Sequence, residues 1–311
     1  MTAPSRLVVI VGPTASGKSA LGIRIAERFG GEILICDSTQ VYRGFDIGTA
    51  KVPLAERRGI PHYLMDLVDP PDVFTAGEYR RQALLVLDNL RRRDRLPVIT
   101  AGTGLYLRAL LEGLAEAPTR SEELRERLRQ TEKRHGPGHL HRILARLDQE
   151  TSKRIAPRDS QKVIRAIELR LLTGKKVGDI HRSGRSALEG YAIRKIGLLP
   201  PRAALYKRIE SRAIAMLDAG WIDEVRQLVS RGVPPEAKPF QFIGYSQLRD
   251  VVDGRVSKGD AIKQIQQATR NFAKRQLTWF RKEPGVQWLE GFGDDPEIAS
   301  AALKIIEAPW S

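Results

Sequence analysis

The sequence predicts an α/β protein in which a parallel sheet is flanked by helices and interrupted by a helical insertion. The first observation is an apolar run, Leu7–Val11, followed at once by a Gly-rich segment. The second is an alternation of strand-like and helix-like segments through residue 110, which is typical of parallel sheets. The third is a change between residues 115 and 190, where basic helical segments replace the strands.

The Gly-rich segment, Gly12-Pro13-Thr14-Ala15-Ser16-Gly17-Lys18-Ser19, fits the pattern G-x-x-x-x-G-K-[ST]. Its place between a buried strand and a helix predicts a phosphate-binding P-loop, so we expect a sheet of the P-loop NTPase type. The glycines let backbone N–H groups point inward around phosphate oxygens. Lys18 is expected to neutralise the terminal phosphates, and the Ser19 hydroxyl to bind a Mg²⁺ ion. The pattern alone does not say which phosphate compound is held.

Strands of the core are expected where continuous apolar runs end in a turn. These runs cover residues 7–11, 32–36, 97–100 and, after the insertion, 191–199. Helices are expected at 18–29, 76–93 and 105–111, and the chain after the last strand is predicted to be mainly helical. Residues 1–114 and 191–311 are thus predicted to form one catalytic core with C-terminal helices.

Residues 115–190 are predicted to form the helical insertion domain. Ser121 can cap a helix with acidic residues in its first turn and arginines later, an order that the helix dipole favours. Further helices are expected at 139–148 and 160–172. His135, His139 and His141 lie in a Gly/Pro-rich stretch without matching carboxylates or cysteines, so we interpret them as surface residues rather than metal ligands.

The charge of the chain predicts a polyanionic partner. The 311 residues carry a formal net charge of +15, and the pI is near 10.1. Residues 115–311 hold 37 Lys and Arg against 25 Asp and Glu, whereas residues 1–114 hold 15 against 12. This excess outside the phosphate-binding third favours a nucleic acid as the partner.

The single cysteine, Cys36, excludes an internal disulfide and a Cys-based zinc cluster. No apolar run approaches the roughly 18 residues that a membrane span needs, and the first apolar run is too short for a signal peptide. We therefore expect a cytoplasmic protein that acts as a monomer and does not bind membranes.

The helix expected at about 260–282 has two contrasting faces. With Arg270 at 0°, Lys263, Lys274 and Arg281 fall within about 40° of it at 100° per residue. The apolar residues Ile265, Ala268, Phe272 and Trp279 fall on the opposite side of the helix, between about 160° and 220°. A solvated face is the usual explanation of such a charged stripe. Because no acid interrupts these cations, we predict that Arg270 and Lys274 contact nucleic-acid phosphates.

Asp37 closes the second predicted strand, so its carboxylate is expected at the edge of the sheet where α/β proteins bind ligands. Two interpretations are open from spacing alone. The carboxylate could hold Mg²⁺, as in a nucleotide hydrolase or kinase, or it could accept a proton from a nucleophile that faces the phosphates. The polar residues after it, 38–43, are suited to reading the edge of a nucleobase.

Gly102-Thr103-Gly104 forms a second turn between a strand and a helix. It could supply another anion site or a hydroxyl contact from Thr103. The strand before it, 97–100, does not end in the acidic residue that would support an NTPase.

Taken together, these segments resemble the tRNA dimethylallyltransferase family, also called tRNA isopentenyltransferases, over nearly the whole chain. The matching segments are the P-loop 12–19, residues 37–44 and 46–51, Pro61-His62 with Asp66, residues 102–106 and 161–168, Ile243-Gly244-Tyr245, and residues 269–280. Two positions depart from the family pattern: Ala101, where glycine is usual, and Tyr63, where a second histidine is common.

The resemblance implies transfer of a dimethylallyl group from its diphosphate to N6 of the adenosine 3′-adjacent to the anticodon. The P-loop would then hold the diphosphate leaving group with Lys18 and a Mg²⁺ ion at Ser19, and Asp37 would accept the N6 proton. By family position, Asp37, Ser38, Thr39, Gln40 and Thr103 would contact the target nucleotide. Contacts to the anticodon stem-loop are implied for Arg125, Gln161, Lys162, Val163, Ile164 and Arg165.

Three other functions remain to be weighed. An adenylate isopentenyltransferase would perform the same chemistry on free AMP, but it has no need of a basic insertion. A small-molecule P-loop kinase explains the P-loop but not the polar run after Asp37. A non-catalytic RNA-binding module explains the charge but leaves the P-loop without a function.

Overall fold

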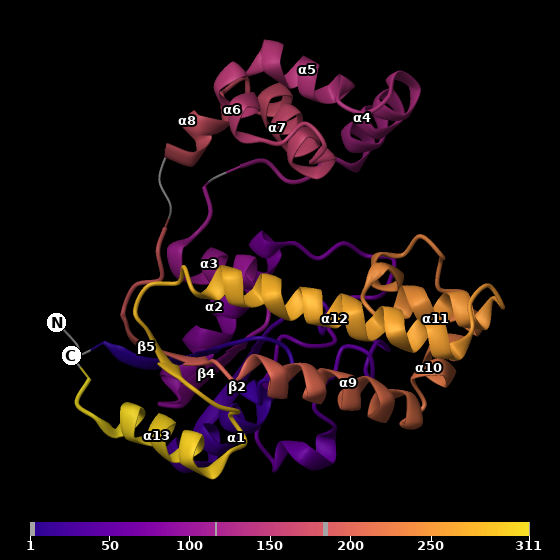
Figure 1. The fold of residues 1–311 in the computed structure, drawn as a ribbon. Helices are drawn as coiled ribbons and strands as arrows, with labels where there is room; N and C mark the ends of the chain where they lie inside the picture. The colour runs from indigo at the N-terminus through magenta and orange to yellow at the C-terminus, as the bar shows by residue number, and fades with distance from the viewer. Residues whose placement is uncertain (1–3, 116, 183–185, 311) are drawn as a thin grey trace. The chain divides into compact units, whose positions relative to one another are not determined.

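A computed structural model describes residues 4–310 except 116 and 183–185. Its contacts divide the chain into two compact units (Figure 1). The core unit comprises the chain up to residue 111 and from residue 188 onward, and the helical unit comprises residues 112–187. The sequence analysis places these boundaries at 115 and 190.

The core unit is built on one six-stranded sheet in the order β3-β2-β4-β1-β5-β6. All of its neighbouring strands are parallel. The strands are β1 (Ser5–Val11), β2 (Gly31–Cys36), β3 (His62–Tyr63), β4 (Leu96–Ala101), β5 (Tyr191–Leu198) and β6 (Val286–Leu289). In the register, Ala101 pairs with both Cys36 and Val11, so β1, β2 and β4 end side by side. The prediction of a P-loop-type parallel sheet is confirmed.

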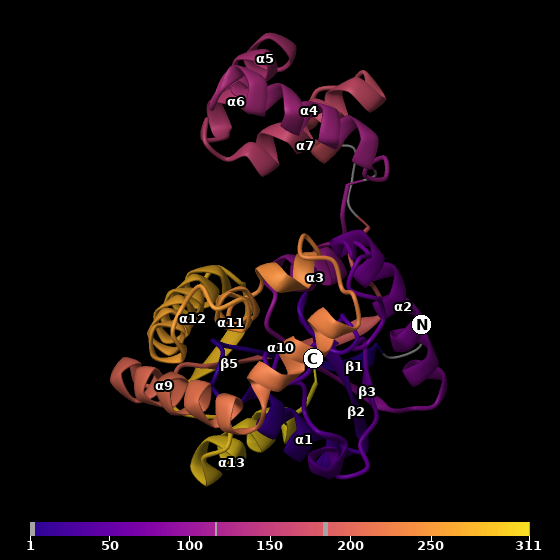
Figure 2. The same ribbon diagram turned by 90° about the vertical axis from the view of Figure 1, so that its right-hand side faces the viewer.

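The two faces of the sheet bury alternate residues of each strand. In β1, Val8 and Ile10 face a cluster that includes apolar residues of α1 (Lys18–Phe29) and α13 (Pro296–Glu307). Leu7 and Val9 face the larger cluster on the other side. Helices contributing to that cluster are α2 (Ala76–Arg92), α3 (Gly104–Glu112), α9 (Arg202–Asp218), α10 (Trp221–Ser230), α11 (Tyr245–Val252) and α12 (Lys258–Phe280). Figure 2 shows α1 and α13 together, away from α12.

Several elements of the core unit differ from the sequence prediction. The short strands β3 and β6 and the helix α13 are not predicted, and neither are the single-turn helices η1 (Leu54–Arg57) and η2 (Lys238–Gln241). β3 has two residues and β6 has four, too few for a recognisable apolar pattern. The long helices and the four predicted strands form close to their expected bounds.

The helical unit has its own small core. Its helices are α4 (Glu122–His135), α5 (His139–Leu147), α6 (Gln149–Arg154), α7 (Ser160–Thr173) and α8 (Val177–Arg182), of which α6 and α8 are not predicted. Ser121 caps α4 by accepting a hydrogen bond from the Leu124 amide, as expected. The apolar core joins α4, α5 and α7 through residues such as Leu128, Leu144 and Ile167. Among the described residues, no helix is long and apolar enough to span a membrane.

A buried carboxylate connects α4 to α7. Glu168 is fully buried and accepts hydrogen bonds from Arg125 at 2.8 and 2.9 Å, from Arg165 at 2.6 Å and from the Ser121 amide at 2.8 Å. Burial acts to raise the pKa of Glu168, but the hydrogen bonds from both arginines and the Ser121 amide outweigh it and hold the pKa at about 2. The ionised carboxylate therefore stabilises the unit at neutral pH, and this contribution is lost as pH falls from the unfolded value near 4.5 toward 2.

We predict that Glu168→Gln lowers the free energy of unfolding of the helical unit by about 1–3 kcal/mol, since two arginines lose their shared charged partner. Urea unfolding at pH 7, followed by circular dichroism, measures this loss. Glu126→Gln is the matched control, because Glu126 pairs with Arg129 on the exposed side of α4 and is expected to change stability by less than about 0.5 kcal/mol. Equal effects of the two variants would contradict a special role for Glu168.

Candidate active site

The P-loop turns tightly from β1 into α1. Gly17 and Ala15 have positive φ, and Gly17 immediately precedes the first residue of α1. A side chain on Gly17 would collide with Asp294, whose carboxylate lies 2.4 Å from the position of such a Cβ. The loop is also fixed by a hydrogen bond from the segment after β6, in which the Gly293 amide donates to Ser16 O at 2.9 Å. The sequence-predicted P-loop residues therefore form one rigid turn at the N-terminus of a helix, which favours anion binding.

Lys18 folds back over the P-loop. Its ammonium donates to Gly12 O at 2.9 Å and to Pro13 O at 2.7 Å. Desolvation lowers the pKa of Lys18 to about 7, with attraction to Asp37 opposing the fall and repulsion from Arg212 adding to it. Among the described residues, Lys18 hydrogen-bonds only to neutral carbonyl oxygens, and a bound phosphate would give it an anionic partner.

Asp37 directly follows the last residue of β2, and its carboxylate faces the turn that follows β4. Its Oδ1 accepts from the Thr39 amide at 2.8 Å and from the Thr39 hydroxyl at 2.6 Å. Its Oδ2 makes no hydrogen bond among the described residues and lies 2.3 Å from where a Cβ of residue 102 would stand. Gly102 is therefore required for the carboxylate to occupy this position, and one oxygen stays available for a substrate proton.

Thr103 aligns the residue after Asp37. Its hydroxyl oxygen accepts from the Ser38 amide at 2.9 Å and donates to the Ser38 hydroxyl at 3.2 Å. The amides of Gly102 and Thr103 both donate to Cys36 O at 3.0 Å. The structure thus brings Asp37, Ser38 and Thr103 together at one edge of the sheet.

Gln276 on α12 joins this turn to the P-loop. Its Oε1 accepts from the Thr14 amide at 2.7 Å, and its Nε2 donates to Gly102 O at 2.8 Å. The side chain is buried, so both halves of the amide are satisfied inside the protein. The sequence analysis misses this role because a glutamine on an amphipathic helix carries no local signal of a distant backbone partner.

Two arginines of α9 also reach the P-loop. Arg212 donates to the Thr14 hydroxyl at 3.2 Å, and Arg208 forms a two-fold ion pair with Asp294 at 2.6 and 2.8 Å. Desolvation and the neighbouring Arg208 lower the pKa of Arg212, and attraction to Asp37 opposes this. Arg212 makes no ion pair among the described residues, which indicates a site for an anion. In the sequence, the only sign of this role is that Arg208 and Arg212 lie four residues apart, next to the apolar stripe of α9.

These groups surround a large cavity of the core unit, with a volume of about 1340 Å³. One part of its wall is polar and includes residues 14–19, Asp37, Thr39, Gln40, Arg208, Arg212 and Gln276. Another part is apolar and includes Ile209, Ala213, Met216, Ile243, Ile265 and Phe272. The cavity can therefore hold a ligand that has both a phosphate end and a small hydrocarbon group.

The long loop between β2 and β3 forms part of the wall and is fixed from within. Lys51 is nearly buried and donates to Tyr42 O at 2.6 Å while pairing with Asp46 and Asp66. Gln40 donates to Thr49 O at 3.1 Å. Tyr63, the position that departs from the resembled family, donates to the buried Glu32 at 2.7 Å. The contacts of Lys51 and Gln40 join residues that line the cavity, whereas the Tyr63–Glu32 pair joins β3 to β2 away from it.

Ser19 meets the requirement for a Mg²⁺ ligand beside a bound phosphate. It lies in the first turn of α1, lines the cavity and has no hydrogen-bond partner among the described residues. Mg²⁺ usually takes few protein ligands and completes its shell with substrate phosphates and water. Within the part of the chain that the structure describes, no group of three His, Cys, Asp or Glu residues could hold a metal by itself. Of the three histidines considered as metal ligands, His141 has its Nε2 atom 3.0 Å from the carbonyl oxygens of both Ser152 and Ile155, so this nitrogen is already bonded within the helical unit.

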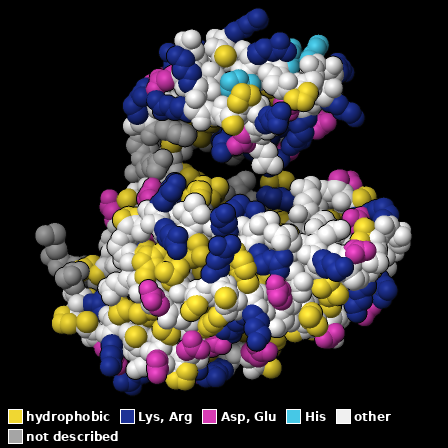
Figure 3. All heavy atoms as spheres, viewed as in Figure 1, with side chains coloured by type: hydrophobic (Ala, Val, Ile, Leu, Met, Phe, Trp, Pro, Cys, Tyr) yellow, Lys and Arg dark blue, Asp and Glu magenta, His cyan; other side chains and the backbone are white. Residues whose placement is uncertain are grey.

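The helical unit corrects part of the predicted tRNA contacts. The side chains of Val163 and Ile164 are buried in its core, so a contact of these two positions with tRNA would have to come from the backbone. Arg125 and Arg165 are bound to Glu168, which gives them a structural role. Gln161 and Lys162 are exposed at the start of α7. Figure 3 shows Lys and Arg side chains spread over the visible face of this unit.

The cationic stripe predicted for α12 is only partly open. Arg270 pairs with Glu210 at 2.5 Å and also donates to Gln267, so its charge is already matched within the protein. Lys274 is exposed and has no ion-pair partner among the described residues. The prediction of a phosphate contact therefore stands for Lys274 and is weakened for Arg270.

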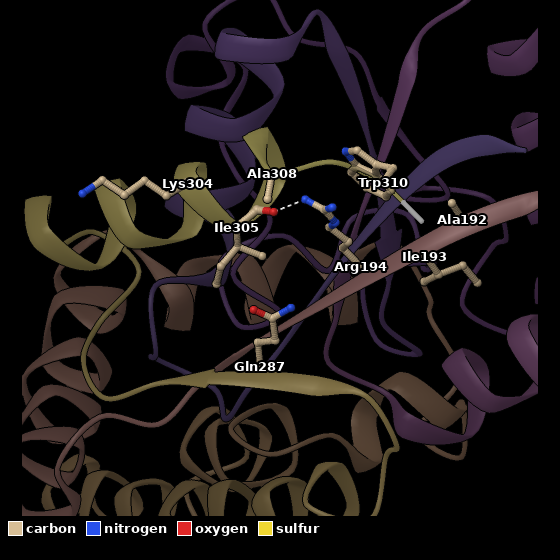
Figure 4. A pocket seen from close by; sticks show the side chains of 8 residues that line it. All are labelled: Ala192, Ile193, Arg194, Gln287, Lys304, Ile305, Ala308 and Trp310. Atoms are coloured by element: carbon tan, nitrogen blue, oxygen red, sulfur yellow. Dashed lines mark hydrogen bonds between the residues drawn. The ribbon is translucent and has the colours of Figure 1, made fainter. Parts of the chain in front are cut away.

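A second, smaller cavity of about 520 Å³ lies between β5 and the C-terminal segment (Figure 4). Arg194 dominates it, with its guanidinium 4.3 Å from the ring of Trp310 and hydrogen-bonded to the carbonyls of Ile305 and Pro309. The described residues that line it include no Asp, Glu, His, Ser or Cys, and the contacts of Arg194 fix the end of α13 against β5, so we assign this cavity a structural role.

Comparison with known proteins identifies relatives over almost the entire chain. Residues 40–283 match the family model described as IPP transferase. The chain is 50% identical to a tRNA dimethylallyltransferase of Solibacter usitatus, with 96% of each chain covered. It is 48% identical to a tRNA dimethylallyltransferase of Koribacter versatilis, covering 97% of this chain and 98% of that one.

Solved structures resemble this fold as well. The full-length tRNA isopentenylpyrophosphate transferase of Bacillus halodurans is 35% identical, with a TM-score of 0.71 and coverage of 97% of this chain and 95% of that one. A eukaryotic dimethylallyltransferase acting on tRNA is 25% identical, with a TM-score of 0.82 and coverage of 97% and 78%.

We predict that Arg212→Met weakens the binding of inorganic diphosphate by tenfold or more, because a charged hydrogen bond to an anion contributes about 1.5–3 kcal/mol. The measurement is the shift in melting temperature with diphosphate and Mg²⁺, converted to a dissociation constant. Arg202→Met on the exposed start of α9 is the control and is expected to bind like the wild type. Unchanged binding by the Arg212 variant would show that Arg212 does not contact the anion.

Proposed function

The chain belongs to the IPP transferase family, and we propose that it transfers a dimethylallyl group from dimethylallyl diphosphate to tRNA. The acceptor is N6 of the adenosine 3′-adjacent to the anticodon, and diphosphate is released. The observation that carries the proposal is the convergence of three strand ends: the P-loop after β1, Asp37 after β2 and Gly102 after β4 line one cavity. An anion site and a proton acceptor thus face a common space.

The P-loop in this proposal binds the leaving group. As the carbon–oxygen bond breaks, negative charge develops on the diphosphate, and preorganised cations stabilise it more than the starting substrate. Lys18 and Arg212 are the cations nearest to Thr14 and the loop carbonyls. A Mg²⁺ ion at Ser19 would supply further positive charge to the same oxygens. The apolar wall near Ile209 and Met216 would hold the dimethylallyl group.

Asp37 in this proposal accepts the proton that N6 loses. The N6 nitrogen forms its bond to the allylic carbon, the electron pair of the broken bond leaves with diphosphate, and the N6 proton passes to Oδ2. Thr39 holds Oδ1 by two hydrogen bonds, so the carboxylate is fixed with its other oxygen free. Because the adenine amine is a weak nucleophile, holding it in line with the allylic carbon matters as much as the base.

The tRNA is expected to approach with its target adenine turned out of the anticodon-loop stack, since a stacked base cannot enter a cavity. Gln40 and Thr39 line the cavity next to Asp37 and can contact this base. Exposed cations without ion-pair partners among the described residues, such as Arg142 and Arg146 on α5, are suited to the phosphates of the stem. They take the place of Arg125 and Arg165, which are used within the helical unit.

The test is a transfer assay with radiolabelled dimethylallyl diphosphate, Mg²⁺ and either unmodified tRNA or AMP. We expect label on tRNA and not on AMP. Label on AMP alone would support an adenylate isopentenyltransferase. A parallel reaction with γ-labelled ATP tests the P-loop kinase, and phosphoryl transfer there without prenyl transfer would overturn the proposal.

We predict that Asp37→Asn lowers kcat for tRNA by about 10²–10⁴-fold, the usual contribution of a general base, while the amide keeps the shape of the side chain. Binding of tRNA, measured by filter retention at fixed salt, is expected to stay within a few-fold of wild type. Asp69→Asn is the control, because Asp69 is an exposed carboxylate that pairs only with Arg43. Parallel loss of turnover and of binding in the Asp37 variant would instead indicate a structural role.

A further inference from the structure

An exposed tryptophan lies next to the candidate active site. Trp279, near the end of α12, has 37% of its surface accessible, whereas Trp221 and the rings of Tyr79 and Tyr106 in the same unit are buried. It follows Gln276 by one helical turn, and Gln276 is bound to Gly102. Trp279 lies on the predicted apolar face of its helix, but the residues that are buried are Ala261, Ile265, Ala273, Gln276 and Phe280, so of the predicted face only Ile265 is among them.

The indole of Trp279 packs on one side of α3. A Cβ on Gly104 would lie 2.0 Å from Cδ1 and Nε1 of the ring and 2.6 Å from Cε2, distances that place it over the ring face rather than at the edge. The guanidinium of Arg108 lies over the same ring, 4.8 Å from its centroid. Gly104 and Arg108 are one turn apart on one face of α3, so both contact the indole from the α3 side. We therefore infer that the accessible 37% of Trp279 lies mainly on the side of the ring away from α3.

This arrangement fixes a flat aromatic surface in place before any ligand arrives. The absent side chain of Gly104 permits the close approach, and the cation–π contact with Arg108 restrains the ring further. Exposed aromatic rings that remain rigid are the groups on which proteins stack single-stranded nucleobases.

The position of the ring matches a nucleotide next to the target. Oδ2 of Asp37 lies beside Gly102, and Gly104 is only two residues further along the chain, a span of at most about 7 Å. When the target adenine leaves the loop stack, its neighbours lose a stacking partner, at a cost of a few kcal/mol. A base that stacks on Trp279 would recover part of that loss.

We propose that the solvent-facing side of the Trp279 ring is a stacking platform for a base adjoining the target adenosine in the tRNA anticodon loop. This inference rests on the proposed function. Trp279 is then a positioning residue: it stabilises the loop conformation that delivers N6 to Asp37 and takes no part in proton transfer.

The experiment compares Trp279→Phe, which keeps an aromatic face, with Trp279→Leu, which keeps apolar volume but removes the ring. Leu85→Ala is the control, an exposed apolar residue of α2 in the same unit. Each enzyme is assayed with an anticodon stem-loop RNA that is either intact or abasic at the 5′ or the 3′ neighbour of the target. We expect Trp279→Leu to raise KM for intact RNA by about tenfold, the value of one stacked base, and Trp279→Phe by much less.

The decisive measurement is the coupling between ring and base. Removing the stacked neighbour should raise KM about tenfold in wild type and in the Leu85 control but have little further effect in Trp279→Leu, because the interaction is already lost. If both abasic substitutions affected wild type and Trp279→Leu equally, the platform would be excluded and Trp279 would be a surface residue only.

Failure of the proposed function gives a different result. In that case the wild type would transfer no prenyl group to intact stem-loop RNA or to tRNA, whatever the state of residue 279. Fluorescence gives an independent readout, since stacking quenches indole emission: RNA binding should quench the wild type and leave Trp279→Phe, which retains Trp221, Trp288 and Trp310, nearly unchanged. Equal quenching in both proteins would also overturn the platform.

Discussion

The buried amide of Gln276 connects the two turns on which the candidate chemistry depends. It accepts from the P-loop at Thr14 and donates to the turn after β4 at Gly102, so the anion site and the proton acceptor are held at one spacing. A buried amide that lost either partner would leave an unsatisfied polar group, which costs about 1–3 kcal/mol. Trp279 follows on the same helix one turn later and packs at Gly104. Helix α12 thus contacts both the P-loop and the turn after β4 at the edge of the sheet.

The cations of the protein fall into two groups: some form ion pairs within the fold, and others are positioned to bind an anion. Arg125 and Arg165 neutralise Glu168, and Arg270 neutralises Glu210, so these charges contribute to packing. Lys18 and Arg212 instead lie beside the P-loop and contact no carboxylate of the described residues, and burial lowers the pKa of both. Such unmatched charges destabilise the unliganded protein and are stabilised only when a phosphate compound binds.

Local patterns in the sequence predicted the sheet, the P-loop and the position of Asp37, because strand ends and Gly-rich turns are encoded by neighbouring residues. They could not predict the groups that act across the fold. Gln276 and Arg212 reach the P-loop from 262 and 198 residues away, and the pattern of their own helices does not show which backbone or side chain they contact. The same limit applies to Val163 and Ile164, because a motif matched by position does not say that their side chains face the core of the helical unit.

The strand β4 explains why this P-loop serves a transferase. In the sheet β4 lies between β1 and β2, so the turn after it stands between the anion site and Asp37. An acid there would bind the metal of a nucleotide hydrolase, but β4 ends in Thr100-Ala101 and continues into Gly102. Gly102 instead leaves room for the Asp37 carboxylate, and Thr103 aligns Ser38 beside it. In the proposed reaction, this leaves the position next to the phosphates to an incoming nucleophile, and the P-loop would hold the group that departs.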